Sequence, residues 1–246
     1  MVEMSRDDGA TMLLPRPGSG RAFSTERRVR LSDTTADGYL RLDALARYIQ
    51  DVASDDARQT MTATYLAWVV RRTLIEITKP AVSEELCELT TWCSGFGGRW
   101  AERRTSLVGD HGARVDSAVI WVAINPETGA PARLPETFEL AYGEAAQGRK
   151  VTARLQHGDP PDDGDRQAWR FRAADIDRLG HVNNAAYWTI LEELLVESDR
   201  SNGLRAELEH RDAVEPGIEL EIVGGSTAGW LIDQDRGVKA SFSVSP

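Results

Sequence analysis

The sequence is poor in residues that mark several large protein classes. Its 246 residues include two cysteines, Cys87 and Cys93, which lie six positions apart on a segment typical of a strand. Six positions on one strand span about 20 Å, which is too far for a disulfide. We therefore expect two buried thiols in a reduced compartment.

Long apolar runs are also missing near the N-terminus. The run at residues 12–14 is interrupted by Pro15 and Pro17. This is far below the length of a signal sequence or a membrane-spanning helix. We expect a cytoplasmic protein with no membrane span.

Basic charge is scarce as well. The chain has 29 Lys and Arg against 39 Asp and Glu, which gives a formal net charge of −10. Binding to nucleic acid requires a basic face, so the charge argues against a nucleic-acid partner. An acidic carrier protein would need a local patch of arginines, for which the candidates are Arg71, Arg72, Arg99, Arg103 and Arg104.

Motifs of several common chemistries are absent. The histidines His111, His157 and His210 form no pair at metal-ligand spacing, so we expect no metal site. The glycines at 95–98 lack the lysine and the following helix of a phosphate loop. The chain also has no Gly-x-Ser-x-Gly elbow.

The chain contains the same order of predicted elements twice. We expect a disordered tail over residues 1–20, one unit over 21–142, a linker rich in Gly, Pro and Asp over 143–167, and a second unit over 168–246. Each unit begins with an extended segment and continues with an apolar helix and several strands. The expected helices lie at 42–53 and 184–198, and the expected strands at 66–77, 85–94, 100–108, 114–124, 206–212, 218–223, 230–233 and 238–244. This pattern predicts an α+β fold in which one helix covers an antiparallel sheet in each unit.

The two units also align in sequence, which indicates an internal duplication. Asp33 and Asp175 stand 142 positions apart within matching segments. The same offset pairs Gln50 with Glu192, Asp51 with Glu193, Thr35 with Asp177, and Tyr39 with His181. The polar cluster is therefore expected in the second copy alone.

That cluster precedes the second predicted helix and reads Asp175-Ile-Asp177-Arg-Leu-Gly180-His181-Val-Asn183-Asn184. Asn183 or Asn184 is expected to cap the helix, and amides at its start could stabilise an oxyanion. Asp177 could deprotonate water or attack a carbonyl directly. The simpler alternative makes Asp177 a turn residue, His181 a structural histidine and Glu193 an ordinary solvated glutamate.

The pattern Asp175-x-Asp177-x-x-Gly180-His181-Val-Asn183-Asn184-x-x-Tyr187 resembles the hot-dog thioesterases. The two-copy arrangement is similar to the acyl-acyl carrier protein thioesterase family, from about Phe23 to the C-terminus. Four further stretches resemble the first domain of that family: Arg47-Tyr-Ile-Gln50-Asp51, Ala67-Trp68-Val-Val-Arg71-Arg72, Thr90-Thr-Trp92 with Arg103-Arg104, and Val119-Ile-Trp121.

The resemblance implies a tandem hot-dog, with two long helices each wrapped by an antiparallel sheet and the acyl chain between the two domains. It implies hydrolysis of a fatty acyl thioester of acyl carrier protein or coenzyme A, with no metal or bound cofactor, and two copies of the pseudo-dimer could associate as a homodimer. The candidate catalytic residues are Asp177, His181, Asn183 and Glu193. The candidate substrate-binding residues are Gly180, Val182, Asn184 and Trp188.

The sequence departs from the family pattern at three positions. Leu179 stands where the family has a catalytic Asn, and Ala213 and Val214 stand where it has a Glu-Cys pair, with Asp212 one position away. These departures favour a second interpretation, a non-catalytic protein that binds fatty acyl groups. Hydration of an enoyl thioester is a third interpretation with weaker support, because its Asp-x-x-x-x-His pattern is not matched.

Overall fold

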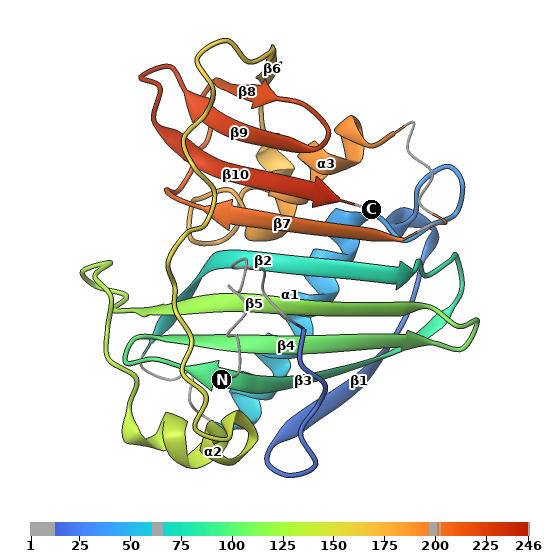
Figure 1. Cartoon of the computed structure of the whole chain (residues 1–246), viewed down its shortest axis with the longest axis vertical. Coiled ribbons are helices and arrows are strands. Elements are labelled where there is room, and N and C mark those ends of the chain that lie inside the picture. The colour runs from blue at the N-terminus through green and yellow to red at the C-terminus, as the bar shows by residue number, and fades with distance from the viewer. Residues whose placement is uncertain (1–12, 61–65, 197–200, 202, 246) are drawn as a thin grey trace, which may run out of the picture.

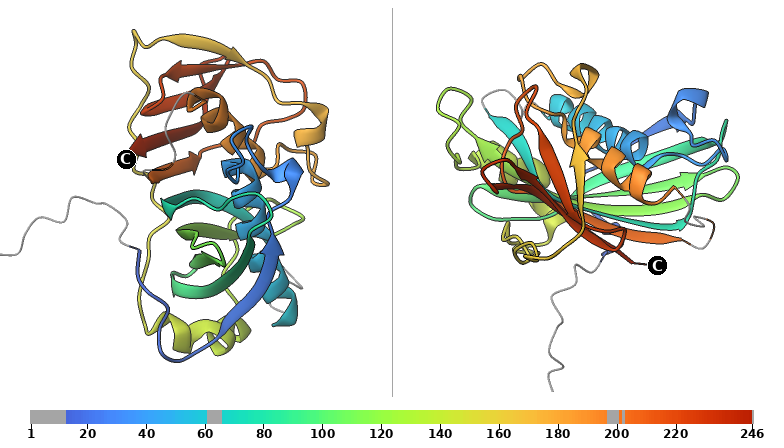
Figure 2. Two further views of the ribbon diagram at one scale, coloured as in Figure 1. Left: turned by 90° about the vertical axis from the view of Figure 1, so that its right-hand side faces the viewer. Right: turned by 90° about the horizontal axis from the view of Figure 1, so that it is seen from above.

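The computed structural model describes residues 13–60, 66–196, 201 and 203–245. Ten strands form one antiparallel sheet in the order β1-β3-β4-β5-β2-β7-β10-β9-β8-β6. The two central helices lie side by side on one face of this sheet, and the segment that joins the two halves crosses the other face (Figures 1 and 2). The fold is a double hot-dog, as predicted.

Each half contributes five strands. The first half has β1 (Ala22–Arg28), β2 (Ala67–Lys79), β3 (Leu86–Phe96), β4 (Trp100–Gly109) and β5 (Arg114–Ile124). The second half has β6 (Arg166–Trp169), β7 (Leu204–His210), β8 (Leu220–Gly224), β9 (Ala228–Asp233) and β10 (Val238–Ser245). Read from either outer edge, the order is first, third, fourth, fifth and second strand of the half. The duplication seen in the sequence is therefore repeated in the sheet topology.

The helices differ in length. Helix α1 (Leu42–Gln59) has 18 residues and buries a continuous apolar face. The helix of the second half begins as a 3₁₀ turn, η3 (Asn184–Tyr187), and continues as α3 (Trp188–Leu194), seven residues long. Within the described residues the helix predicted over 184–198 therefore begins as predicted and ends at Leu194, and Ser198 lies outside the described residues.

The two halves meet where β2 pairs with β7, from Arg72 opposite Glu209 to Ile77 opposite Leu204. A bulge in β2 shifts its register with β5 between Val70 and Arg72. Because side chains alternate along a regular strand, the extra residue allows both Val70 and Thr73 to face the helices. Apolar side chains of both halves then form one continuous core.

The linker follows α2 (Glu136–Ala146), a helix that the sequence analysis did not predict and that crosses the expected boundary at residue 143. It runs across the outer face of the sheet (Figure 1). Side chains of several strands form hydrogen bonds to its backbone. Trp100 Nε1 donates to Val151 O at 2.8 Å, and Trp230 Nε1 donates to Gly158 O at 2.9 Å. The linker is thus bound to strands of both halves.

The strands agree with the prediction to within a few residues at each end, whereas the register shifts in β2, β3 and β10 were not predicted. Cys87 and Cys93 are free and buried, as predicted, and burial raises the pKa of Cys93 to about 11. Most of the expected tail lies outside the described residues. No helix in the part of the chain that the structure describes is both long enough and apolar enough to cross a membrane.

Asp56, near the end of α1, is fully buried and holds three neighbours together. Its carboxylate accepts hydrogen bonds from Arg21 Nε at 2.7 Å, from the Tyr142 hydroxyl at 2.9 Å and from the guanidinium of Arg103. Arg103 is only 8% exposed. The ion pair between Asp56 and Arg103 therefore links α1 to β4, and the hydrogen bond from Tyr142 links α2 to α1.

We expect Asp56→Ala to lower the free energy of unfolding by about 3–5 kcal/mol, because it leaves the buried Arg103 guanidinium without a counter-charge. The matched control is Asp55→Ala, which removes partly exposed ion pairs with Arg27 and Arg58 and should cost less than about 1 kcal/mol. Urea denaturation of both variants measures the difference. Equal destabilisation would contradict the role of Asp56.

Candidate active site

The polar loop of the second half is held by four backbone hydrogen bonds. Asp177 N donates to His181 O at 2.9 Å, Gly180 N to Asp177 O at 3.0 Å, Asn183 N to Asp175 O at 2.8 Å, and Val182 N to Val214 O at 3.0 Å. Gly180 has a φ of +84°, a conformation that favours glycine. The loop is therefore a rigid turn.

The loop of the first half repeats this turn bond for bond. Thr35 N donates to Tyr39 O at 2.8 Å, Gly38 N to Thr35 O at 3.0 Å, Arg41 N to Asp33 O at 2.9 Å, and Leu40 N to Ala81 O at 2.8 Å. Gly38 also has a φ of +84°. The two loops thus share one backbone and differ in their side chains.

Asp177 is partly exposed, and its Oδ1 accepts a hydrogen bond from Leu179 N at 2.8 Å. In the first loop the hydroxyl of Thr35, the counterpart of Asp177, also accepts a hydrogen bond within the turn, but from Tyr39 N at 3.2 Å. The turn role considered for Asp177 is thus present in the structure. Its second carboxylate oxygen has no hydrogen-bond partner among the described residues, so it can still contact a ligand.

Asp175 has a structural role at the start of the loop. It is 9% exposed, and it accepts bonds from Arg172 N at 2.7 Å and from the Arg172 guanidinium at 2.8 Å. Burial opposes ionisation of Asp175, but the bonds from Arg172 outweigh this and lower its pKa. Asp175 therefore stays charged and fixes the loop.

The other candidate residues lie in different surroundings. His181 and Gly180 are exposed, Val182 is 5% exposed, and Asn183 caps η3 by accepting from Ala185 N at 2.9 Å. Glu193 is exposed, in agreement with the alternative that it is an ordinary solvated glutamate. Its neighbour Glu192 instead accepts a hydrogen bond from Leu42 N, the first amide of α1.

A pocket lies between the two helices and the sheet, with about 280 Å³ of empty space that includes the solvent at its mouth. Residues of both halves line it: Ala46, Ile49, Gln50, Val70, Thr73, Val119, Trp121, Asn184, Ala185 and Trp188. Two of the predicted substrate-binding residues, Asn184 and Trp188, are among them. Sequence analysis missed Gln50, Thr73 and Trp121, because their position depends on pairing between halves and on the bulge in β2.

The pocket lining is apolar except for a few groups that can form hydrogen bonds. These belong to Gln50, Thr73, Asn184 and Trp121. The indole N–H of Trp121 is buried and has no hydrogen-bond partner in the described structure. A few polar groups in an apolar concave site are typical of ligand pockets.

The segment that replaces the family's Glu-Cys pair contacts the loop through its backbone. Val214 is 2% exposed, and its carbonyl accepts from Val182 N. Asp212, the nearest carboxylate in sequence, accepts from Lys239 Nζ at 2.6 Å, which lowers its pKa. At the two positions that the resemblance aligns with this pair, the side chains are therefore apolar, and the carboxylate of Asp212 pairs with Lys239.

His210, at the end of β7, packs edge-on against the ring of Tyr187 with 4.7 Å between ring centroids. It is 8% exposed, and its Nε2 has no hydrogen-bond partner among the described residues. Burial, together with the charge of Arg71, lowers the pKa of His210 to about 3. The imidazole is therefore neutral at physiological pH.

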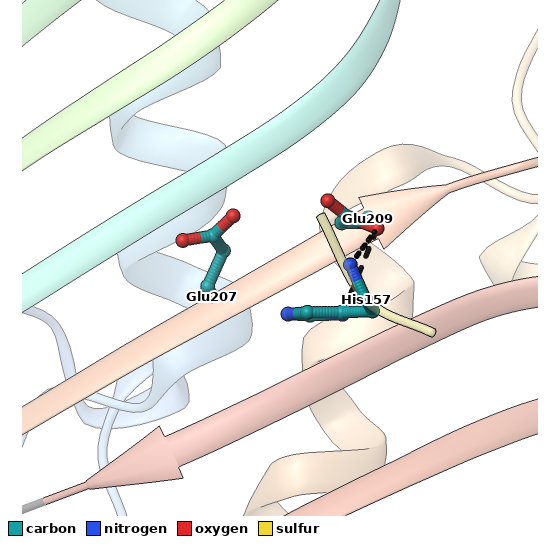
Figure 3. Close-up of side chains that lie close together, drawn as sticks. All are labelled: His157, Glu207 and Glu209. Atoms are coloured by element: carbon teal, nitrogen blue, oxygen red, sulfur yellow. Dashed lines mark hydrogen bonds and ion pairs between the residues drawn. The ribbon is translucent and has the colours of Figure 1, made fainter. Parts of the chain in front are cut away.

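A cluster on the outer face, His157, Glu207 and Glu209, has the donor types of a metal site (Figure 3). Their existing contacts argue against that use. Both oxygens of Glu209 accept backbone amides, from Gln156 and from His157, while both ring nitrogens of His157 contact serine hydroxyls. Arg72 Nε lies 3.4 Å from Glu207 Oε1, where it would repel a metal cation. The cluster anchors the linker to β7.

The arginines considered for a carrier patch do not form one. Arg72, Arg103 and Arg104 are 6%, 8% and 1% exposed and pair with Glu207, Asp56 and Glu102 respectively. Arg71 donates to the backbone carbonyls of His210 and Arg211. Charged residues on these strands are buried because the helices cover one face of the sheet and the linker crosses the other. The prediction of a shared surface patch is wrong.

Comparison with known proteins agrees with this architecture. The acyl-ACP thioesterase N-terminal domain matches residues 20–142, and the acyl-ACP thioesterase C-terminal domain matches residues 158–240. The uncharacterized protein Rv2001 of Mycobacterium tuberculosis is 31% identical over 212 residues, which is 85% of each chain. The oleoyl-acyl carrier protein thioesterase of Coriandrum sativum is 25% identical over 80% of this chain and 62% of its own length.

A solved structure shows the same fold. The 12:0-ACP thioesterase of Umbellularia californica superposes with a TM-score of 0.71 at 19% identity, over 91% of this chain and 96% of that one. Fold and pocket thus define a tandem hot-dog protein with its pocket at the junction of the two halves. Within that class, the chain belongs to the acyl-ACP thioesterase family, a family of thioester hydrolases.

We expect His210→Phe to flatten the pH dependence of stability. Because the folded-state pKa of His210, about 3, lies below the ordinary value of about 6.5, the unfolded chain binds a proton in this window that the folded chain does not. Stability is therefore lost as the pH falls through this window, by about 1.4 kcal/mol per pH unit for one histidine. Urea denaturation between about pH 6 and pH 4 should show that slope reduced in the variant.

The control is His111→Gln, at an exposed histidine of the turn between β4 and β5. Its slope should equal that of the wild type. The same slope for His210→Phe and wild type would contradict burial of a neutral imidazole at this position.

Proposed function

We propose that this protein hydrolyses the thioester bond of acyl groups carried by acyl carrier protein or coenzyme A. The observation that supports this most directly is the pocket between the halves. It is largely apolar, and Asn184, at the end of the polar loop, lines it. An acyl chain in the pocket would bring its thioester close to the loop that carries Asp177.

The proposed reaction needs a base and a site for negative charge. Asp177 takes a proton from water, and the hydroxide attacks the thioester carbonyl carbon. The carbonyl oxygen becomes an oxyanion that backbone amides of the loop stabilise. When the C–S bond breaks, the thiolate leaves with the proton from Asp177, and a free fatty acid remains. Direct attack by Asp177 through an anhydride is the alternative route to the same products.

The remaining candidates have supporting roles in this proposal. His181 is exposed beside the loop, where it can contact the thiolate of a carrier arm. Asn183 holds the first turn of η3, and Gly180 and Val182 fix the loop backbone. Trp188 lines the pocket and is 1% exposed. Glu193 has no contact that supports a catalytic role.

We expect Asp177→Asn to reduce hydrolysis at least about tenfold, measured as free thiol released from medium- and long-chain acyl donors. Asparagine keeps a side-chain oxygen that can accept from Leu179 N, so the turn is preserved while the charge is removed. The matched control is Asp212→Asn, which changes a neighbouring carboxylate paired with Lys239 and should leave the rate unchanged. A rate for Asp177→Asn equal to that of the wild type would exclude Asp177 as base and as nucleophile.

A second candidate function, acyl binding without turnover, is favoured by Leu179. This residue replaces the family's catalytic Asn and is 60% exposed, and no carboxylate replaces the family's Glu. Tight binding of a fatty acyl thioester with no release of thiol would identify this function. Parallel assays with carrier-protein and coenzyme A esters would identify the head group.

A further inference from the structure

One contact between the two helices suggests a role for Gln50. Glu192, on α3, accepts a hydrogen bond from Leu42 N, the first amide of α1. This contact shows that a side chain of this length, at this position of one helix, reaches the starting amide of the other helix. The Leu42 amide is therefore already paired with a protein acceptor.

Because the two halves are duplicates, the contact between Glu192 and Leu42 has an equivalent pair of residues in the other orientation. At the offset of 142 positions, Glu192 corresponds to Gln50 and Leu42 corresponds to Asn184. Both halves have the same strand order, and the loops before Leu42 and Asn184 have the same hydrogen bonds. By this correspondence, the Gln50 side chain extends toward the Asn184 amide.

The pocket lies where this correspondence places the two residues. Gln50 and Asn184 both line it, one from each half of the molecule. The structure describes no hydrogen bond to the Gln50 carboxamide and no acceptor for the Asn184 N–H. The side-chain amide of Gln50 and the backbone N–H of Asn184 are thus two donors in one pocket, and neither has an acceptor among the described residues.

We propose that Gln50 is an oxyanion donor: its Nε2 and the backbone N–H of Asn184 together bind the carbonyl oxygen of the acyl thioester. This inference rests on the proposed hydrolase function and adds a catalytic residue from the first half. Both groups donate hydrogen bonds and no proton is transferred, so the covalent steps are unchanged. Donors positioned at a developing oxyanion typically contribute about 10²–10³ in rate.

The amide group of Gln50 is essential to this role. A carboxylate in its place would accept the Asn184 N–H, as Glu192 accepts the Leu42 N–H, and would repel the oxyanion. The first amide of each helix is thus used differently: Glu192 accepts the Leu42 N–H, whereas Gln50 leaves the Asn184 N–H available to a ligand. The loops differ in the same sense, since Asp177 and His181 belong to the loop that precedes Asn184, whereas Thr35 and Tyr39 belong to the loop that precedes Leu42.

The pocket lining contains no titratable side chain. Asp51, the neighbour of Gln50 on α1, lies outside this lining, and partial desolvation raises its pKa. A glutamate at position 50 would therefore be the one carboxyl group among the ten lining residues. The protonation state of this glutamate depends on pH, and the rate of hydrolysis is expected to change with it.

The test measures kcat of Gln50→Glu, Gln50→Ala and the wild type between about pH 5 and pH 8, with acyl-CoA and with acyl carrier protein esters. For each ester and each pH, kcat of the variant is divided by kcat of the wild type. We expect Gln50→Ala to lower kcat about 10²–10³-fold at every pH. Gln50→Glu should be at least as defective at about pH 8 and should approach the wild type at about pH 5, where its protonated carboxyl donates a hydrogen bond. The matched control, Glu192→Gln, makes the same exchange in the opposite half and should leave kcat unchanged.

Each other outcome has a distinct meaning. If the wild type releases no thiol from any donor, the proposed function fails and this inference fails with it. If the wild type is active and the Gln50→Glu ratio does not change with pH, or if Gln50→Ala raises KM alone, Gln50 is not an oxyanion donor although the hydrolase function stands. Circular dichroism and urea denaturation of each variant separate these results from misfolding.

Discussion

The antiparallel pairing of β2 with β7 is the interaction on which the rest of the structure depends. It joins two five-stranded halves into one sheet and fixes the positions of α1 and α3 on the same face. The pocket exists because of this pairing, since its lining combines α1, β2 and β5 of one half with η3 and α3 of the other. Neither half alone provides the whole lining of the pocket.

A shared backbone allows the two halves to differ in chemistry at little structural cost. The loops before the two helices form the same turn, with the same hydrogen bonds and the same positive φ at Gly38 and Gly180. Because the turn is held by the backbone, its side chains can change without altering its shape. Thr35 and Tyr39 in one copy, and Asp177 and His181 in the other, illustrate this freedom.

The sequence predicted those features that depend on local pattern. Segments rich in Val, Ile, Thr and Trp between turn residues located the strands, the helical period located α1, and the matching segments around Asp33 and Asp175 revealed the duplication. The features that it did not predict depend on contacts between distant segments. Glu192, rather than Glu193, faces α1, and Trp121 and Thr73 reach the pocket through strand pairing and a bulge. Arg103 and Arg104 gave the pattern of a charged surface, yet covering elements on both faces of the sheet bury them.

The linker affects how the protein can move. Its backbone crosses the seam between the halves and is bound on both sides: to β4 at Val151, to β2 through Arg72 and Arg154, to β7 through Glu209, and to β9 at Gly158. A hinge motion that separated the halves would break these contacts together with the β2–β7 ladder. Rearrangements of side chains at the mouth of the pocket break fewer contacts than this, and side-chain rotamers change on a shorter timescale than domains open.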